Sequence, residues 1–98
     1  MATIIGSDGN DTLFGSNGSD RIDSFNGDDL VFGGSGNDLI ISWSGNDTMY
    51  GESGNDTIDG DIGADYLDGG SGDDSIFGYS GGDTLIGGTG KDTLGGGG

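Results

Sequence analysis

Cysteine, histidine and proline are all absent from the 98-residue chain. Without cysteine, no disulfide can stabilise a fold, and the usual ligands of zinc and copper are missing along with histidine. The remaining metal ligands are the oxygens of Asp, Asn, Glu and backbone carbonyls, which suit hard cations such as calcium. A metal site in this chain would therefore be built from oxygen alone.

Hydrophobic and basic residues are scarce as well. Only 29% of the residues are hydrophobic, too few for an ordinary globular core, and 26 glycines add a large backbone entropy cost to folding. Arg21 and Lys91 stand against 18 acidic residues, so the formal charge is −16 and self-repulsion opposes a compact state unless cations neutralise it. Nucleic acid and anionic membranes are therefore poor partners.

Long apolar stretches are also missing, and no run approaches the roughly 18 residues that a membrane span needs. The segment from Met1 to Ile5 lacks the basic and long apolar regions of a cleaved signal peptide. If the protein is exported, we expect the route to use no N-terminal signal.

Ten nonapeptides run from Gly6 to Gly95 without an insertion or deletion. The fourth position is always glycine: Gly9, Gly18, Gly27, Gly36, Gly45, Gly54, Gly63, Gly72, Gly81 and Gly90. The sixth position is always aspartate: Asp11, Asp20, Asp29, Asp38, Asp47, Asp56, Asp65, Asp74, Asp83 and Asp92. The eighth is always aliphatic or Met, so each copy predicts a six-residue turn and a three-residue strand whose middle side chain faces the core.

Odd and even copies differ, which predicts a true period of eighteen residues and two facing sheets. The first position is glycine in every even copy, whereas Ser24 and Ser42 occupy it in two odd copies. The expected core of the even copies is Ile22, Ile40, Ile58, Ile76 and Leu94. That of the odd copies is Leu13, Val31, Met49, Leu67 and Leu85. Stiff β-branched residues thus line one sheet and more adaptable residues the other.

This pattern resembles the G-G-x-G-x-D-x-U-x calcium repeat of the repeats-in-toxin (RTX) proteins, over about nine-tenths of the chain. The resemblance implies an all-β fold, a right-handed parallel β-roll of about five coils with two short parallel sheets. It also implies calcium between turns stacked on the same edge, folding on calcium binding, and an extracellular location, in a secreted RTX protein or an engineered calcium-responsive β-roll.

We expect a single domain over residues 1–98. Residues 1–5 form an N-terminal half-repeat strand in which Ile4 extends the isoleucine ladder, residues 6–95 form the ten repeats, and residues 96–98 are a glycine tail that begins an eleventh turn. No capping sequence follows, which is unusual for a solenoid and leads us to expect a trimmed or engineered fragment.

The repeated aspartates and glycines are the candidate metal residues. A turn that points several carbonyls at an ion needs backbone conformations that glycine reaches cheaply, and a carboxylate has two oxygens with which to reach ions on both sides. If each ion lies between copy n and copy n+2, ten copies make eight sites, and eight divalent ions would balance the charge of −16. Surface acids such as Asp23, Asp59 and Asp68 lie outside the turns. Asx-turns that bond only their own backbone are the alternative, which ten copies in register disfavour.

Other functions are less well supported. The chain has no nucleophile with a base, so we expect no catalytic residues. An ice-binding roll remains an alternative, although the regular Thr-x-Asn row of such rolls is absent. A partner- or ligand-binding surface is a further alternative, because aromatic residues gather in the odd copies. The sequence groups Phe25, Phe32, Trp43 and Tyr50 into one cluster and leaves Tyr79 isolated. The plainer explanation of these aromatic residues is that they only shield the roll from solvent.

Overall fold

The computed structural model describes residues 2–96, and in this range every regular element is a three-residue strand. They are β1 (Thr3–Ile5), β2 (Thr12–Phe14), β3 (Arg21–Asp23), β4 (Leu30–Phe32), β5 (Leu39–Ile41), β6 (Thr48–Tyr50), β7 (Thr57–Asp59), β8 (Tyr66–Asp68), β9 (Ser75–Phe77), β10 (Thr84–Ile86) and β11 (Thr93–Gly95). Each begins at the seventh repeat position, where β-formers follow the turn. Residues 97–98 of the expected glycine tail lie outside the described residues.

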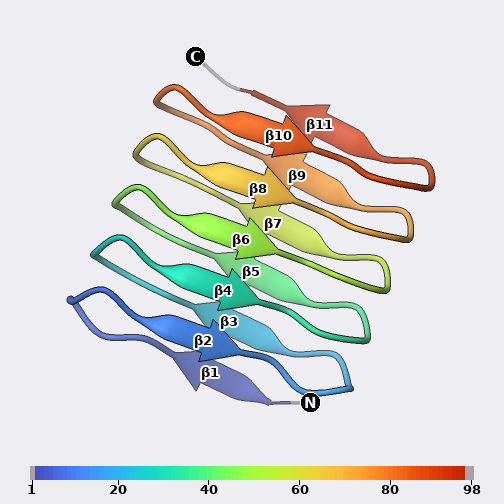
Figure 1. The fold of residues 1–98 in the computed structure, drawn as a ribbon, viewed down its shortest axis with the longest axis horizontal. Coiled ribbons are helices and arrows are strands. Elements are labelled where there is room, and N and C mark those ends of the chain that lie inside the picture. The colour runs from blue at the N-terminus through green and yellow to red at the C-terminus, as the bar shows by residue number, and fades with distance from the viewer. Residues whose placement is uncertain (1, 97–98) are drawn as a thin grey trace.

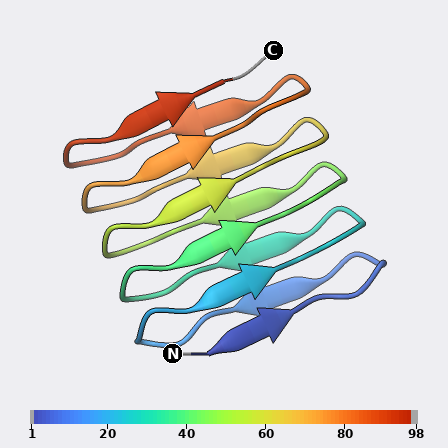
Figure 2. The same ribbon diagram turned by 180° about the vertical axis from the view of Figure 1, so that it is seen from behind.

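The strands form two parallel sheets, as the alternation of odd and even copies predicts. Sheet A has the order β1-β3-β5-β7-β9-β11 and sheet B the order β10-β8-β6-β4-β2. Partners are eighteen residues apart, for example Ile22 with Ile40 and Val31 with Met49. The chain is thus a β-solenoid of about five coils, with sheet B in front in Figure 1 and sheet A in front in Figure 2. No helix in the described range is long and apolar enough to cross a membrane.

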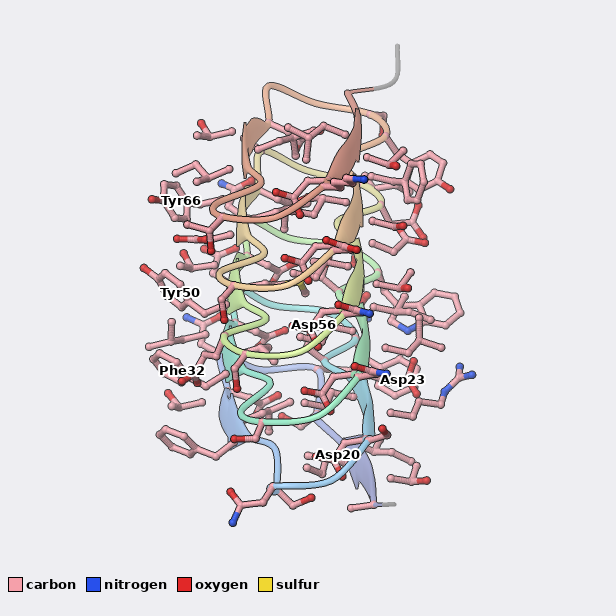
Figure 3. All side chains as sticks on the ribbon, turned by 90° about the vertical axis from the view of Figure 1, so that its right-hand side faces the viewer. Asp20, Asp23, Phe32, Tyr50, Asp56 and Tyr66 are labelled. Atoms are coloured by element: carbon pink, nitrogen blue, oxygen red, sulfur yellow. The ribbon has the colours of Figure 1, made fainter. Side chains whose placement is uncertain are left out.

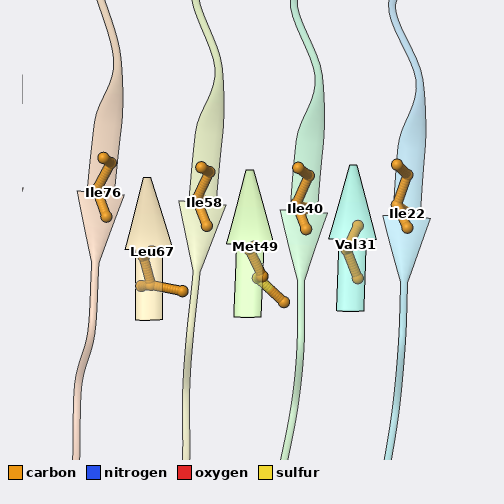
Figure 4. Packing of buried hydrophobic residues seen from close by; sticks show 7 residues of the cluster. All are labelled: Ile22, Val31, Ile40, Met49, Ile58, Leu67 and Ile76. Atoms are coloured by element: carbon orange, nitrogen blue, oxygen red, sulfur yellow. The ribbon is translucent and has the colours of Figure 1, made fainter. Parts of the chain in front are cut away.

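One side chain per strand supplies the core between the sheets. The fully buried residues alternate between the two sheets along the axis (Figure 4): Ile22, Val31, Ile40, Met49, Ile58, Leu67 and Ile76. Ile4, Leu13 and Leu85 pack against them and are partly buried. The prediction is wrong for Leu94, which is 48% exposed, because β11 is the edge strand of sheet A and has only β9 beside it.

Steric crowding explains why the fourth turn position is always glycine. From copy 3 to copy 10 it has a left-handed backbone, for example φ 107° at Gly45. A Cβ there would lie 2.0 Å from the carbonyl oxygen of Gly27, one coil earlier. Gly9 in the first coil differs, since its φ is not left-handed and no earlier coil crowds it. The stacking of coils, more than the single turn, therefore requires glycine.

A polar ladder runs along each edge at the fifth turn position. On the odd edge, formed by the turns of copies 1, 3, 5, 7 and 9, the side-chain oxygens of Asn10, Asp28 and Asn46 accept the backbone N–H of the next odd turn at 2.8 to 3.0 Å. The third rung ends at Ala64, which has no side-chain acceptor. On the even edge, formed by the other five turns, the ladder continues through Ser19, Asn37, Asn55 and Asp73 to the backbone of Lys91.

Ala64→Asn is expected to stabilise the roll by extending the odd ladder. The new side-chain oxygen can accept the backbone N–H of Gly82, and one net hydrogen bond is worth about 1 kcal/mol. Urea denaturation of the calcium-loaded protein would measure the gain in the free energy of unfolding. Ala64→Leu, similar in size but without an acceptor, is the matched control, and an equal gain in both variants would contradict the ladder explanation.

Candidate metal centre

The ten aspartates form two columns, one along each edge, in which neighbouring coils are hydrogen-bonded. Within a column the backbone N–H of each Asp donates to Oδ1 of the Asp one coil later. Asp29 donates in this way to Asp47, and Asp47 to Asp65, both at 2.8 Å. The odd column comprises Asp11, Asp29, Asp47, Asp65 and Asp83, and the even column Asp20, Asp38, Asp56, Asp74 and Asp92. One carboxylate oxygen is thus already used in joining coils.

The other oxygen of most of these carboxylates is buried without a partner. These atoms are Oδ2 of Asp29, Asp38, Asp47, Asp56, Asp65, Asp74 and Asp83. Buried polar atoms in proteins are normally hydrogen-bonded, since an unpaired one costs free energy. A column of orphaned acceptors therefore points to a positively charged group that the polypeptide does not supply. One further orphan, Asp59 Oδ1, lies outside the columns on β7.

Burial makes the charged state of the central carboxylates costly. It raises the pKa of Asp47 and Asp56 to about 7 and the pKa of Asp65 to about 6, and the carboxylates one coil away add to the shift. Burial likewise raises the pKa of Asp29, Asp38 and Asp74. Without a cation, the folded protein therefore holds rows of negatively charged carboxylates in a poorly solvated environment.

In the first coil, serine residues supply hydrogen bonds to both column aspartates. The Ser7 backbone N–H donates to Asp11 Oδ2 at 2.7 Å, and the Ser7 hydroxyl bonds the same carboxylate. Ser16 does the same for Asp20, and its hydrogen bonds lower the pKa of Asp20. These two carboxylates, though in register with the columns, are held by serines at the second turn position, a role that the repeat pattern did not indicate.

In the turns that begin with glycine, the first position borders Oδ2 of the aspartate in the same turn. A Cβ added at Gly51 would lie 2.5 Å from Asp56 Oδ2 and 2.9 Å from the carbonyl oxygen of Gly69 in the next coil. Glycine therefore keeps a space open between a carboxylate and a backbone carbonyl. In residues 2–96 no three acidic side chains converge on one metal position. A cation in the columns must accordingly draw part of its coordination from backbone oxygens.

The aromatic residues form two separate stacks, which corrects the single cluster expected from the sequence. Phe14, Phe32 and Tyr50 stack with ring centroids 5.2 and 5.3 Å apart. We call this set the sheet B ring stack, since it projects from the outer face of β2, β4 and β6. Figure 3 shows Phe32 and Tyr50, with Tyr66 above them, on one side of the roll and Asp23 on the other. Phe14 is 65% exposed.

The second stack, Phe25 with Trp43, belongs to the opposite side. The second position of an odd turn follows a strand of sheet A, so Trp43 Nε1 reaches Asp23 Oδ1 on β3 at 3.2 Å. Asp23 also pairs with Arg21 at 2.9 Å and is only 5% exposed, so it is not the surface acid expected from the sequence. Tyr79 is not isolated either, because its ring lies 6.2 Å from that of Phe77.

Acidification is expected to stabilise the calcium-free roll. A carboxyl whose pKa is raised on folding binds its proton more tightly in the folded state than in the unfolded state. The stability that this proton adds to the fold is complete below the unfolded pKa near 4, and it is lost as the pH rises to the folded pKa of about 7. The β-sheet circular dichroism of chelator-treated protein should therefore increase from pH 8 to pH 5, a window chosen from these pKa values. Asp47→Asn should reduce this dependence, whereas a signal that falls over the same interval would contradict the burial argument.

Comparison with known families agrees with this geometry. The family model of the RTX calcium-binding nonapeptide repeat matches the chain in four overlapping copies, over residues 5–40, 23–58, 44–76 and 59–94. No curated protein and no solved structure matches the chain. The four copies together extend from Ile5 to Leu94, which includes every aspartate of both columns. The chain belongs to the RTX calcium-binding nonapeptide repeat family, whose repeats form a calcium-binding structural module.

Proposed function

We propose that this chain binds calcium between successive turns along both edges of the roll and that ligation, more than apolar burial, stabilises the fold. The observation that carries this proposal is the set of seven buried Oδ2 atoms without a hydrogen-bond partner, four in the odd column and three in the even column. A divalent cation would satisfy these atoms and remove the like-charge repulsion along each column. Calcium fits because it accepts many oxygen ligands in flexible geometry, including backbone carbonyls.

The ligands proposed are the ten column aspartates together with backbone oxygens of the glycine-containing turns. Pairing copy n with copy n+2 gives about eight ions in ten copies, which matches the charge of −16. Asp11 and Asp20 are the weakest members because serines already satisfy their oxygens. Asp83 and Asp92 belong to the last turn of each column. The proposed role is that of one structural, non-catalytic domain of an extracellular protein, the location that is typical of this family.

Isothermal titration calorimetry of calcium binding to the purified protein tests this proposal. We expect several ions per chain and a loss of bound ions in Asp56→Asn, which replaces an orphaned carboxylate oxygen by an amide. Asp73→Asn is the matched control, because the exposed Asp73 lies outside the columns and Asn keeps the acceptor that Lys91 N–H uses. No heat of binding in the wild type, or equal losses in both variants, would contradict the proposal.

Self-association through the sheet B ring stack is a second candidate function, favoured by its parallel rings and the 65% exposure of Phe14. We expect Phe32→Ser to weaken association of the calcium-loaded protein, measured by sedimentation velocity. Trp43→Ser should change it less, because Trp43 lies on the opposite side against Asp23. A holo-protein that stays monomeric at all concentrations would leave the rings a shielding role only.

A further inference from the structure

Two buried serines replace glycine at the first turn position, both on the odd edge. Ser24 and Ser42 are each 0% exposed, whereas the other eight copies have glycine at this position. In the glycine copies this position borders Oδ2 of the aspartate in the same turn, and at Gly33 and Gly51 also the carbonyl oxygen of the next coil. An added Cβ at Gly60, the next residue of the same row, would lie 2.7 Å from Asp65 Oδ2. The serines therefore place a Cβ and a hydroxyl where the other turns keep open space.

Both hydroxyls bond across coils. Ser24 Oγ donates to the Ser42 carbonyl oxygen at 3.3 Å, and Ser42 Oγ donates to the Gly60 carbonyl oxygen. The odd turns of copies 3, 5 and 7 are thus joined by a short chain of hydroxyl–carbonyl bonds. Each bond occupies a backbone carbonyl oxygen of the next odd turn. Burial raises the pKa of Asp29 and Asp47, and the Ser24 and Ser42 hydroxyls partly offset this rise, so the serines border the same carboxylates whose Oδ2 atoms have no close hydrogen-bond partner.

We propose that Ser24 and Ser42 create two weak calcium sites in the middle of the odd edge, in the gap between copies 3 and 5 and in the gap between copies 5 and 7. This inference rests on the proposed calcium-binding function. A carbonyl oxygen that accepts a hydroxyl proton is a poorer ligand, and the added Cβ narrows the space that a cation must enter. The hydroxyl bonds also hold these turns together without an ion.

The two edges then differ in how they bind calcium. All five even turns have glycine at the first position: Gly15, Gly33, Gly51, Gly69 and Gly87. The gaps of the even edge keep their carbonyl oxygens free of side-chain donors, so calcium binds there first. The middle of the odd edge is stabilised by hydrogen bonds and takes up calcium last. The chain consequently shows two classes of site, with fewer tight ions than the repeat count indicates.

The double variant Ser24→Gly/Ser42→Gly tests this assignment. In calorimetric titrations we expect the wild type to show a tight and a weak class of site. The variant should bind the weak-class ions about tenfold more tightly, because a competing hydrogen bond worth about 1.4 kcal/mol is lost. Ser42→Ala should tighten the weak class less than Ser42→Gly does, because it removes the hydroxyl but keeps the Cβ in the gap. Ser35→Gly, an exposed serine of the even edge, controls for the entropy of an added glycine.

The outcomes separate this inference from the function on which it rests. A wild type that binds no calcium would overturn both. Calcium binding with a single class of site, or a double variant that behaves like Ser35→Gly, would overturn only the role of the serines. Weaker calcium binding in both Ser42→Gly and Ser42→Ala would show that the hydroxyl is itself a calcium ligand, and would reverse the proposal.

Discussion

Treating the protein with a chelator is expected to abolish most of its β-sheet circular dichroism at neutral pH, and adding calcium is expected to restore it along a sigmoidal curve. Without cations, the core consists of seven fully buried side chains, while seven column carboxylates have an orphaned buried oxygen. Each gap needs two ordered turns before an ion can bind, so binding at one gap orders part of the next. We expect an apparent Hill coefficient above about 2.

Magnesium is the control for this experiment. It demands a tighter octahedral geometry and gives up its water reluctantly, so the same concentration of magnesium should restore little of the signal. Equal restoration by both ions would indicate simple charge neutralisation in place of specific ligation. A β-sheet spectrum that persists in excess chelator at neutral pH would contradict folding on calcium binding altogether.

Asp56→Asn is expected to raise the calcium midpoint of folding roughly tenfold, equivalent to about 1.4 kcal/mol. Asp56 occupies the centre of the even column, where it accepts the Asp38 N–H and donates its own to Asp74. Asn can keep the accepted hydrogen bond but replaces the orphaned Oδ2 of a carboxylate that lies between two ions in the proposed arrangement. The same change removes a buried charge, so the calcium-free roll should become more stable at neutral pH, opposite in sign to the effect on calcium binding.

Asp92→Asn is the matched control for position in the column. Asp92 accepts the Asp74 N–H in the same way, but it belongs to the last turn of the same even column and is less deeply buried than Asp56. It should therefore shift the calcium midpoint by clearly less. Circular dichroism during calcium titration would measure both shifts. Equal shifts for the two variants would argue against ions shared between stacked turns.

The regular part of the fold follows from the sequence because it repeats every eighteen residues. Strand positions, the two sheets and their partners all agree with the register read from Gly6 to Gly95. Leu94 is exposed although its sequence position matches that of Ile76, since exposure depends on how many strands flank it. A repeat pattern describes an average coil, and the first and last coils each lack a neighbour.

The sequence by itself determined the turn-and-strand unit, the two-sheet roll and the aspartate columns, because these depend on residue type at a fixed spacing. Only the tertiary structure decided that one oxygen of each interior carboxylate joins two coils while the other is orphaned, and that Ser7 and Ser16 close the first coil. It also placed Trp43 against Asp23, away from Phe32, and buried Ser42 beneath the Gly60 carbonyl. The Ser7 and Ser16 bonds span four positions within one turn. The Trp43 and Ser42 contacts join residues 20 and 18 positions apart, which meet only when the coils stack, so local pattern carries no information about them.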